Sequence, residues 1–293
     1  MVYILMGLLS ALFLGFADFI ATQNSRRIGA LYSLAGMLFA SSIVLTIYLF
    51  FTGGFQNLLI VDNYTSLIMG VLHGILMALA LLLFFHALTI GKVFIVAPII
   101  AAHPVFIILF YFLNGKFLTF SQLIAISAVI IGVVTISISS KKNRTSLNKP
   151  DNLNTILIIS LSSSFLYAVS LLALQYSALF LPEINVLWLA RFFGFLTVIF
   201  IILSKMKFSL IYDLKWWLIF FCHGFLDSIG LLFIIVGTTG SKNDALLLVL
   251  ASTFPVITMI LAWYILKEKM NFFQFIGVKL IIISIGYLIF FHL

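Results

Sequence analysis

HGILMALALLLFFHALTIGKVFIVAPIIAAHP, residues 73–104, returns later in the chain as HGFLDSIGLLFIIVGTTGSKNDALLLVLASTFP, residues 223–255. At an offset of 150 or 151 residues the two copies share residues that are uncommon in apolar runs, as the pairs His73/His223, Gly74/Gly224, Lys92/Lys242 and Pro104/Pro255. Leucine matches arise by chance in so apolar a chain, whereas these do not. An internal repeat of long apolar segments is typical of transporter folds.

The composition excludes a water-soluble protein. Of the 293 residues, 64% are hydrophobic and 8% are charged, whereas a soluble domain carries about 25% charged residues. The net charge of +8 comes from basic residues between apolar runs, which suits loops near anionic headgroups rather than a nucleic-acid partner. The one cysteine, Cys222, excludes an intramolecular disulfide and a cysteine-built metal site. We expect no cofactor, and we read the first apolar run as a retained span rather than a cleaved signal.

Ten apolar runs are long enough to cross a bilayer as helices, which takes about 20 residues each. They are residues 2–22, 30–51, 66–89, 93–113, 119–140, 154–180, 184–204, 216–238, 244–266 and 270–291. The polar linker KKNRTSLNKPDN, residues 141–152, divides five runs from five, so the second half enters the membrane from the opposite side. The sequence therefore predicts an all-α membrane protein of ten transmembrane helices in two inverted five-helix repeats. The expected boundaries are 1–140, a linker at 141–153, and 154–293.

Basic residues predict the orientation. Loops after odd-numbered runs hold twelve lysines and arginines, and loops after even-numbered runs hold two. The positive-inside rule then places the linker in the cytoplasm and both termini outside. We expect a multi-pass protein of the cell membrane, in bacteria the inner membrane.

The last two runs carry the most specific family pattern, Pro255-Val256, then Glu268 in a short loop, then Gln274-x-x-Gly277. In these residues the chain resembles the EamA-like family of the drug/metabolite transporter superfamily. Arg191-Phe192 is similar to that family's Arg-Phe pair, and Asp18-Phe19 followed by Arg26-Arg27 is similar to a subset of it. The first half carries a weaker copy, with Pro104-Val105, then Asn114-Gly115-Lys116 in place of the glutamate, then Gln122.

The resemblance implies a ten-helix secondary transporter of small metabolites that works by alternating access, with the substrate cavity between the halves. It implies no particular substrate. Many relatives keep both termini in the cytoplasm, which is opposite to the orientation that the basic residues predict.

Charged side chains at membrane depth cost about 2.5–3.5 kcal/mol each, so each needs a partner or a water-lined cavity. His223 and Asp227 are four residues apart on one helix face, which makes them a candidate proton site or ligand for a substrate amine. The alternative is a hydrogen-bonded pair that only holds helices together. His73 is the repeat partner of His223 and lies on a stripe of small residues, Gly70, Gly74 and Ala78, which favours close helix packing. A structural bond from His73 to a neighbouring carbonyl is the alternative there.

Two further charged residues have alternative roles. Asp18 is a candidate site for a proton or a cationic substrate, although we favour a salt bridge from Asp18 to Arg26 or Arg27. Arg191 either binds a substrate carboxylate or neutralises Asp227.

Aromatic residues and prolines complete the candidates. Tyr167 and Trp188 are predicted to line the cavity, where their rings would stack on an organic cation or on a ring of the substrate. Pro104 and Pro255 are expected to kink the fourth and ninth spans.

These residues predict a permease for a small polar metabolite, first a zwitterion such as an amino acid and next an amine, with protons as the coupling ion. The alternatives are an integral membrane enzyme and a non-transporting membrane scaffold. An enzyme needs catalytic groups that converge at one membrane face, whereas the polar residues here lie at mid-depth. The expected partners are the substrate, the lipid bilayer and protons, and the chain is expected to be a monomer or a homodimer.

Overall fold

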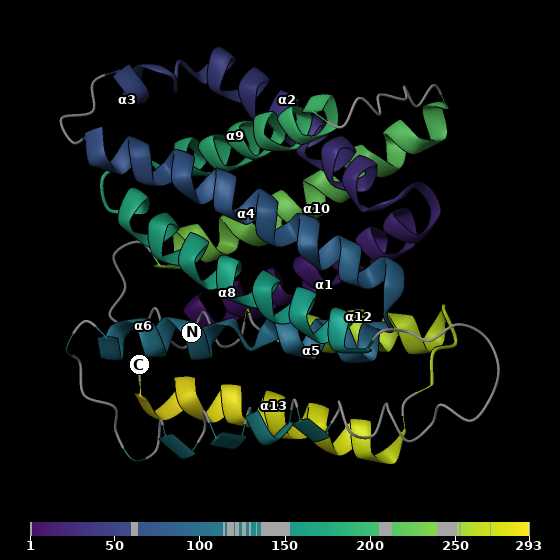
Figure 1. Cartoon of the computed structure of the whole chain (residues 1–293). Coiled ribbons are helices and arrows are strands. Elements are labelled where there is room, and N and C mark those ends of the chain that lie inside the picture. The colour runs from purple at the N-terminus through teal and green to yellow at the C-terminus, as the bar shows by residue number, and fades with distance from the viewer. Residues whose placement is uncertain are drawn as a thin grey trace.

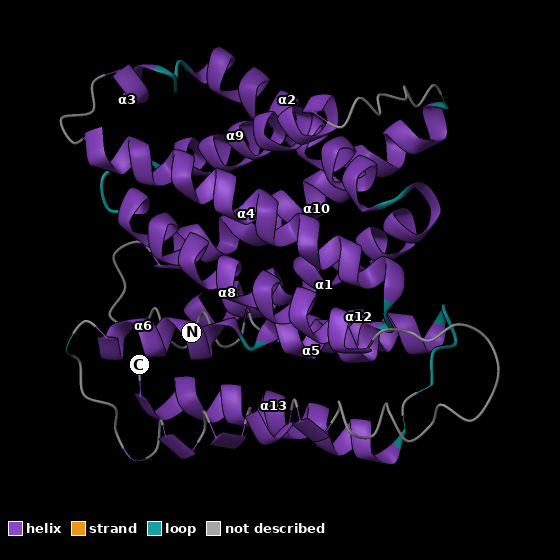
Figure 2. Ribbon diagram, viewed as in Figure 1, coloured by secondary structure: helices purple, strands orange, loops and turns teal. Residues whose placement is uncertain are grey.

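The computed structural model describes residues 2–59, 64–113, 153–204, 213–238, 253–269 and 271–292, together with 115, 120, 123–124, 127–128, 130–132, 134–135 and 251. Within these ranges the chain consists of helices joined by turns and loops (Figure 2). The helices are α1 Val2–Ile28, α2 Ala30–Thr52, α3 Gln56–Leu59, α4 Tyr64–Ile90, α5 Val93–Ala101, α6 His103–Leu113, α8 Leu153–Ala178, α9 Glu183–Ser204, α10 Leu214–Thr238, α12 Phe254–Tyr264 and α13 Phe272–His292.

Seven helical segments in the described part of the chain are long and apolar enough to cross a bilayer. They are α1, α2, α4, the α5–α6 segment, α8, α9 and α10. Their bounds agree closely with the predicted runs, except that α1 continues beyond residue 22 to Ile28. Large apolar side chains such as Phe50 and Phe200 are about three-quarters exposed, at 73% and 74%, as expected for a surface that faces lipid. The chain is therefore an all-α membrane protein.

Both repeat-related prolines lie at helix starts. α5 ends at Ala101 and α6 begins at His103, which places Pro104 in the first turn of α6. Pro255 likewise lies in the first turn of α12. Proline is tolerated in the first turn because the missing N–H has no partner within the helix there. The fourth span is thus broken into two helices, and Pro104 opens the second.

The centre of the molecule is built from α1, α4, α8 and α10 (Figure 1). The two most extensive helix contacts are α4 with α8 and α1 with α10. Each joins the third span of one half to the first span of the other. One hydrogen bond crosses each of these two helix contacts. Ser10 Oγ of α1 donates to the Gly230 carbonyl of α10 at 2.8 Å, and Ser163 Oγ of α8 donates to the Ala80 carbonyl of α4 at 2.7 Å. The two halves are therefore interleaved around one centre.

Glycines set the closest approaches between the halves. A Cβ atom on Gly74 would lie 2.9 Å from the Ala190 carbonyl oxygen, and one on Gly224 would lie 2.8 Å from that of Met37. Both distances are too short for a carbon contact, so only glycine fits against these backbones. The small-residue stripe that includes Gly74 does pack closely against a neighbouring helix, α9, and this prediction is confirmed.

Candidate functional site

Six buried polar side chains come from five helices of both halves and interact near the centre of the fold. Each is at most 7% exposed. They are Asp18 of α1, His73 of α4, Tyr167 of α8, Arg191 of α9, and His223 and Asp227 of α10. We call this set the central cluster. Arg191 lies near enough to both histidines to disfavour a positive charge on them, and the carboxyl groups of Asp18 and Asp227 repel one another when both are ionised.

An ion pair between α9 and α10 forms the core of this cluster. Arg191 Nη2 lies 2.5 Å from Asp227 Oδ2 and also 3.4 Å from the Asp227 carbonyl oxygen, to which it donates. The Arg191 side chain is 1% exposed, yet its Nε and Nη1 have no hydrogen-bond partner in the described structure. A buried N–H without an acceptor is costly. The guanidinium therefore keeps unused donors for an additional anionic group.

The expected His223–Asp227 pair does not form. Asp227 turns to Arg191 instead, because a guanidinium is a stronger partner for a buried carboxylate than a neutral imidazole. The His223 ring stacks on Phe85 with centroids 5.7 Å apart, and its Nδ1 lacks a hydrogen-bond partner among the described residues. Of the two roles predicted for Arg191, the structure shows the neutralisation of Asp227.

His73 is held by one bond and leaves one nitrogen unused. Its Nδ1 lies 2.8 Å from the Ser170 carbonyl oxygen, which is the structural bond predicted as the alternative to a functional role. A carbonyl only accepts, so Nδ1 is the donor, and the Nε2 of the neutral ring is an acceptor. Within the described ranges this Nε2 is buried and has no partner.

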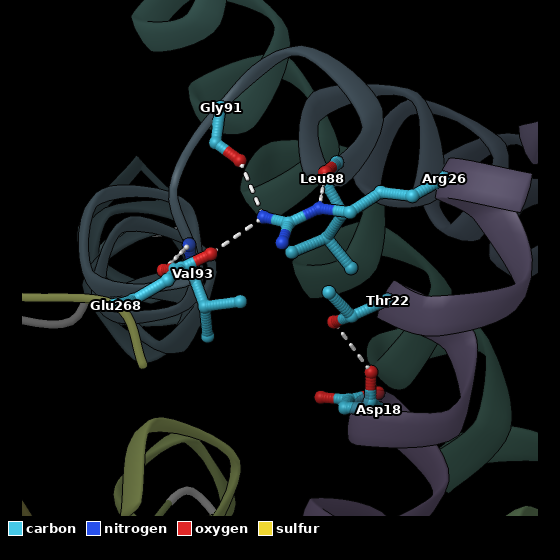
Figure 3. Close-up of polar contacts among 7 residues, drawn as sticks. All are labelled: Asp18, Thr22, Arg26, Leu88, Gly91, Val93 and Glu268. Carbon is cyan, nitrogen blue, oxygen red and sulfur yellow. Dashed lines mark hydrogen bonds and ion pairs between the residues drawn. The ribbon is translucent and has the colours of Figure 1, made fainter. Parts of the chain in front are cut away.

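Asp18 has no salt bridge to Arg26, so that expectation is wrong. Arg26 lies two turns further along α1 and pairs with Glu268, with Nη2 2.7 Å from Oε1 (Figure 3). Arg27 is exposed, whereas Asp18 is buried, and Asp18 Oδ2 has no hydrogen-bond partner in the part of the chain that the structure describes. The Oδ2 of Asp18 is therefore unused within the described residues.

The two aromatic candidates have different surroundings. Tyr167 belongs to the central cluster, since it interacts electrostatically with Asp18, Asp227 and Arg191, and its ring lies 4.8 Å from that of His103. Trp188 is partly buried, donates from Nε1 to Thr46 Oγ1 at 2.8 Å, and packs in an aromatic group with Phe55 and Phe192. Among the described residues, no three His, Cys, Asp or Glu side chains are grouped as metal ligands would be.

The sequence reasoning missed a second polar centre, at the end of α1. Arg26 donates from Nε to the Leu88 carbonyl and from Nη2 to the Gly91 carbonyl, both at 3.0 Å, and pairs with Glu268, whose Oε2 accepts from the Val93 N–H at 3.0 Å (Figure 3). We call these contacts the clasp. The available signal was Glu268, a lone acid between two lysines, and the arginine pair at the end of the first apolar run.

Comparison with known proteins identifies the family. The family model of the EamA-like transporter family matches the chain twice, at residues 1–138 and 154–290. The chain belongs to this family. It is thus a multi-pass membrane protein of an EamA-like transporter family, which is a family of transporters rather than enzymes.

Solved structures support the same fold. One, described as "Crystal structure of protein", has a TM-score of 0.65 and 16% sequence identity, and the match covers 97% of this chain and 94% of that one. At this identity the likeness shows the fold alone. No curated protein sequence matches the chain significantly.

Proposed function

We propose that this EamA-like protein is a secondary transporter that moves a small polar metabolite across the cell membrane, in bacteria the inner membrane, by alternating access. The observation that carries the proposal is the central cluster, which joins helices of both halves and keeps unused hydrogen-bonding atoms. Unpaired polar atoms at membrane depth reduce stability, so their presence favours a function that uses them.

The unused atoms favour a zwitterionic substrate such as an amino acid. Nε and Nη1 of Arg191 can donate to a carboxylate, for which a guanidinium has the matching geometry. The Oδ2 of Asp18, which has no hydrogen-bond partner among the described residues, suits an ammonium group. An amine would use Asp18 alone, with Arg191 remaining on Asp227.

Protons are the proposed coupling ion. Arg191 is paired with Asp227 here, while Asp18 has no cationic partner among the described residues. Protonation of Asp227 would weaken its attraction for Arg191 and free the guanidinium for the substrate carboxylate. Proton binding and substrate binding would then favour one another.

We propose ten spans in two inverted repeats, 1–140 and 154–293. The support comes from counting the membrane crossings between two segments that meet in the clasp. The clasp joins the turn after α4 to the loop after α12, so both lie at one membrane face, and an even number of crossings separates them. The α5–α6 segment, α8, α9, α10 and the run ending in α12 make five. The helical residues described between 120 and 135, where Gly132 approaches α13, would supply the sixth.

The proposal is tested by uptake into proteoliposomes with and without a pH gradient, across amino acids, amines and nucleosides. We expect one class to be transported in response to the gradient, and we expect Asp227→Asn to abolish that response. The matched control is Asp213→Asn, an exposed carboxylate that accepts from the Lys215 N–H. Wild-type gradient response in Asp227→Asn would overturn the assignment of the site, and no uptake of any compound above empty liposomes would contradict transport.

A further inference from the structure

We propose that the clasp is a gate, in which the Arg26–Glu268 ion pair closes the path from one membrane face to Asp18. The inference rests on the proposed transport function. It starts from the contacts of Arg26, which tie together three segments that are distant in sequence: the end of α1, the α4–α5 turn and the α12–α13 loop (Figure 3).

The clasp also supplies hydrogen-bond partners to backbone groups at the two helix ends that meet at the α4–α5 turn. The Leu88 carbonyl belongs to the last turn of α4, and the Val93 N–H opens α5, so neither has a partner within its own helix. Arg26 satisfies the first and Glu268 the second. The charges also match the helix dipoles, with the cation at a C-terminus and the anion at an N-terminus. Separation of the ion pair would therefore loosen the turn as a unit.

The same face of α1 connects the clasp to the central cluster. Asp18, Thr22 and Arg26 are spaced by four residues, which places them one above another along the helix (Figure 3). Arg26 and Glu268 are partly exposed, with side-chain exposures of 29% and 10%, whereas Thr22 is 0% exposed and Asp18 is 7% exposed. Exposure therefore falls along this face of α1 from Arg26 inward to Asp18.

The positions that the repeat relates to Arg26 and Glu268 do not carry an equivalent ion pair. Ser10 and Ser163, which form the matched hydrogen bonds between halves, are 153 residues apart. At that offset the counterparts of Arg26 and Glu268 are Leu179 and Gly115, and neither carries a charge. The ion pair thus holds one face closed without an equivalent pair at the related positions of the other face. By the basic-residue count the closed face is the cytoplasmic one.

The test measures access to Thr22 with a charged, membrane-impermeant thiol reagent. The exposed native cysteine is first removed by Cys222→Ala. Thr22→Cys is then introduced as the reporter, and its modification is measured in right-side-out and in inverted vesicles. With the clasp intact we expect slow modification from both sides. With Glu268→Gln added, which keeps the shape but removes the charge, modification from the clasp side alone should rise about tenfold, the population shift that about 1.4 kcal/mol produces.

Two controls keep the result interpretable. Asp213→Asn removes an exposed carboxylate elsewhere and should leave the modification rate unchanged. Ser25→Cys, a one-atom change at a buried position next to Arg26, provides a second reporter. An unchanged rate at both reporters, or an equal rise from both sides, would overturn the gate. Because labelling requires no substrate, its result is independent of the uptake assay. The gate proposal can therefore be refuted while the transport proposal holds, and the reverse is also possible.

Discussion

The Arg191–Asp227 pair gives the sharpest test of whether the central cluster serves stability or transport. At an effective dielectric constant of about 20, unit charges at the observed separation of 2.5 Å attract by about 7 kcal/mol. Desolvation opposes this attraction, and removal of one member of a buried pair typically costs about 3–5 kcal/mol because the other is left uncompensated. We therefore expect Asp227→Leu to lower the free energy of unfolding by about that amount.

The double variant separates the two roles. Arg191→Met with Asp227→Leu leaves no orphaned charge, and apolar replacements of buried pairs are often neutral or stabilising. We expect the double variant to recover most of the stability lost in Asp227→Leu, measured by reversible detergent unfolding in mixed micelles, while transport stays abolished.

Two outcomes would refute this reasoning. Recovery of transport together with stability would show that the pair is structural. A double variant as unstable as Asp227→Leu would show that the two side chains are not energetically coupled, and the ion pair could not then organise the cluster.

Further predictions concern packing and the buried histidine. Gly74→Ala requires its Cβ to move about 0.5 Å from the 2.9 Å contact with the Ala190 carbonyl, so it should cost about 1–3 kcal/mol in thermal or chemical unfolding, whereas Gly286→Ala meets open space and should cost nothing. Equal effects of the two would contradict the close α4–α9 approach. His73→Leu removes the donor that the imidazole adds to the Ser170 carbonyl, which keeps its partner within α8, and should cost about 0.5–1.5 kcal/mol, whereas His86→Leu, at an exposed position, should be neutral in the same assay.

The helices could be predicted from the sequence because the bilayer imposes a simple rule on length and polarity. The predicted run 30–51 corresponds to α2 at Ala30–Thr52, and 93–113 corresponds to α5 and α6 together. The extension of α1 to Ile28 was not predictable from hydropathy, since its last turn carries two arginines. Within this last turn, Arg26 donates to the carbonyl groups of Leu88 and Gly91.

The partners within the site were harder to predict than its members. Asp18, Arg191 and Asp227 were all candidates because charge at membrane depth needs an explanation. Which of them pair depends on how each helix is rotated about its axis, and sequence spacing shows only neighbours on the same helix. This is why the sequence favoured His223 as the partner of Asp227, and Arg26 or Arg27 as the partner of Asp18. The Glu268–Arg26 contact spans 242 residues, beyond the reach of any local pattern.

The interleaving of the two halves has a consequence for biogenesis. The Ser10 hydroxyl of α1 finds its acceptor 220 residues later, on α10. At a synthesis rate of about 5–20 residues per second, α1 waits about 10 to 45 seconds in the membrane before the Ser10 hydroxyl meets this acceptor. During that interval α1 lacks its contacts with α10, which makes the first half a ready substrate for membrane quality control. Separately expressed halves should therefore survive only when they are made together.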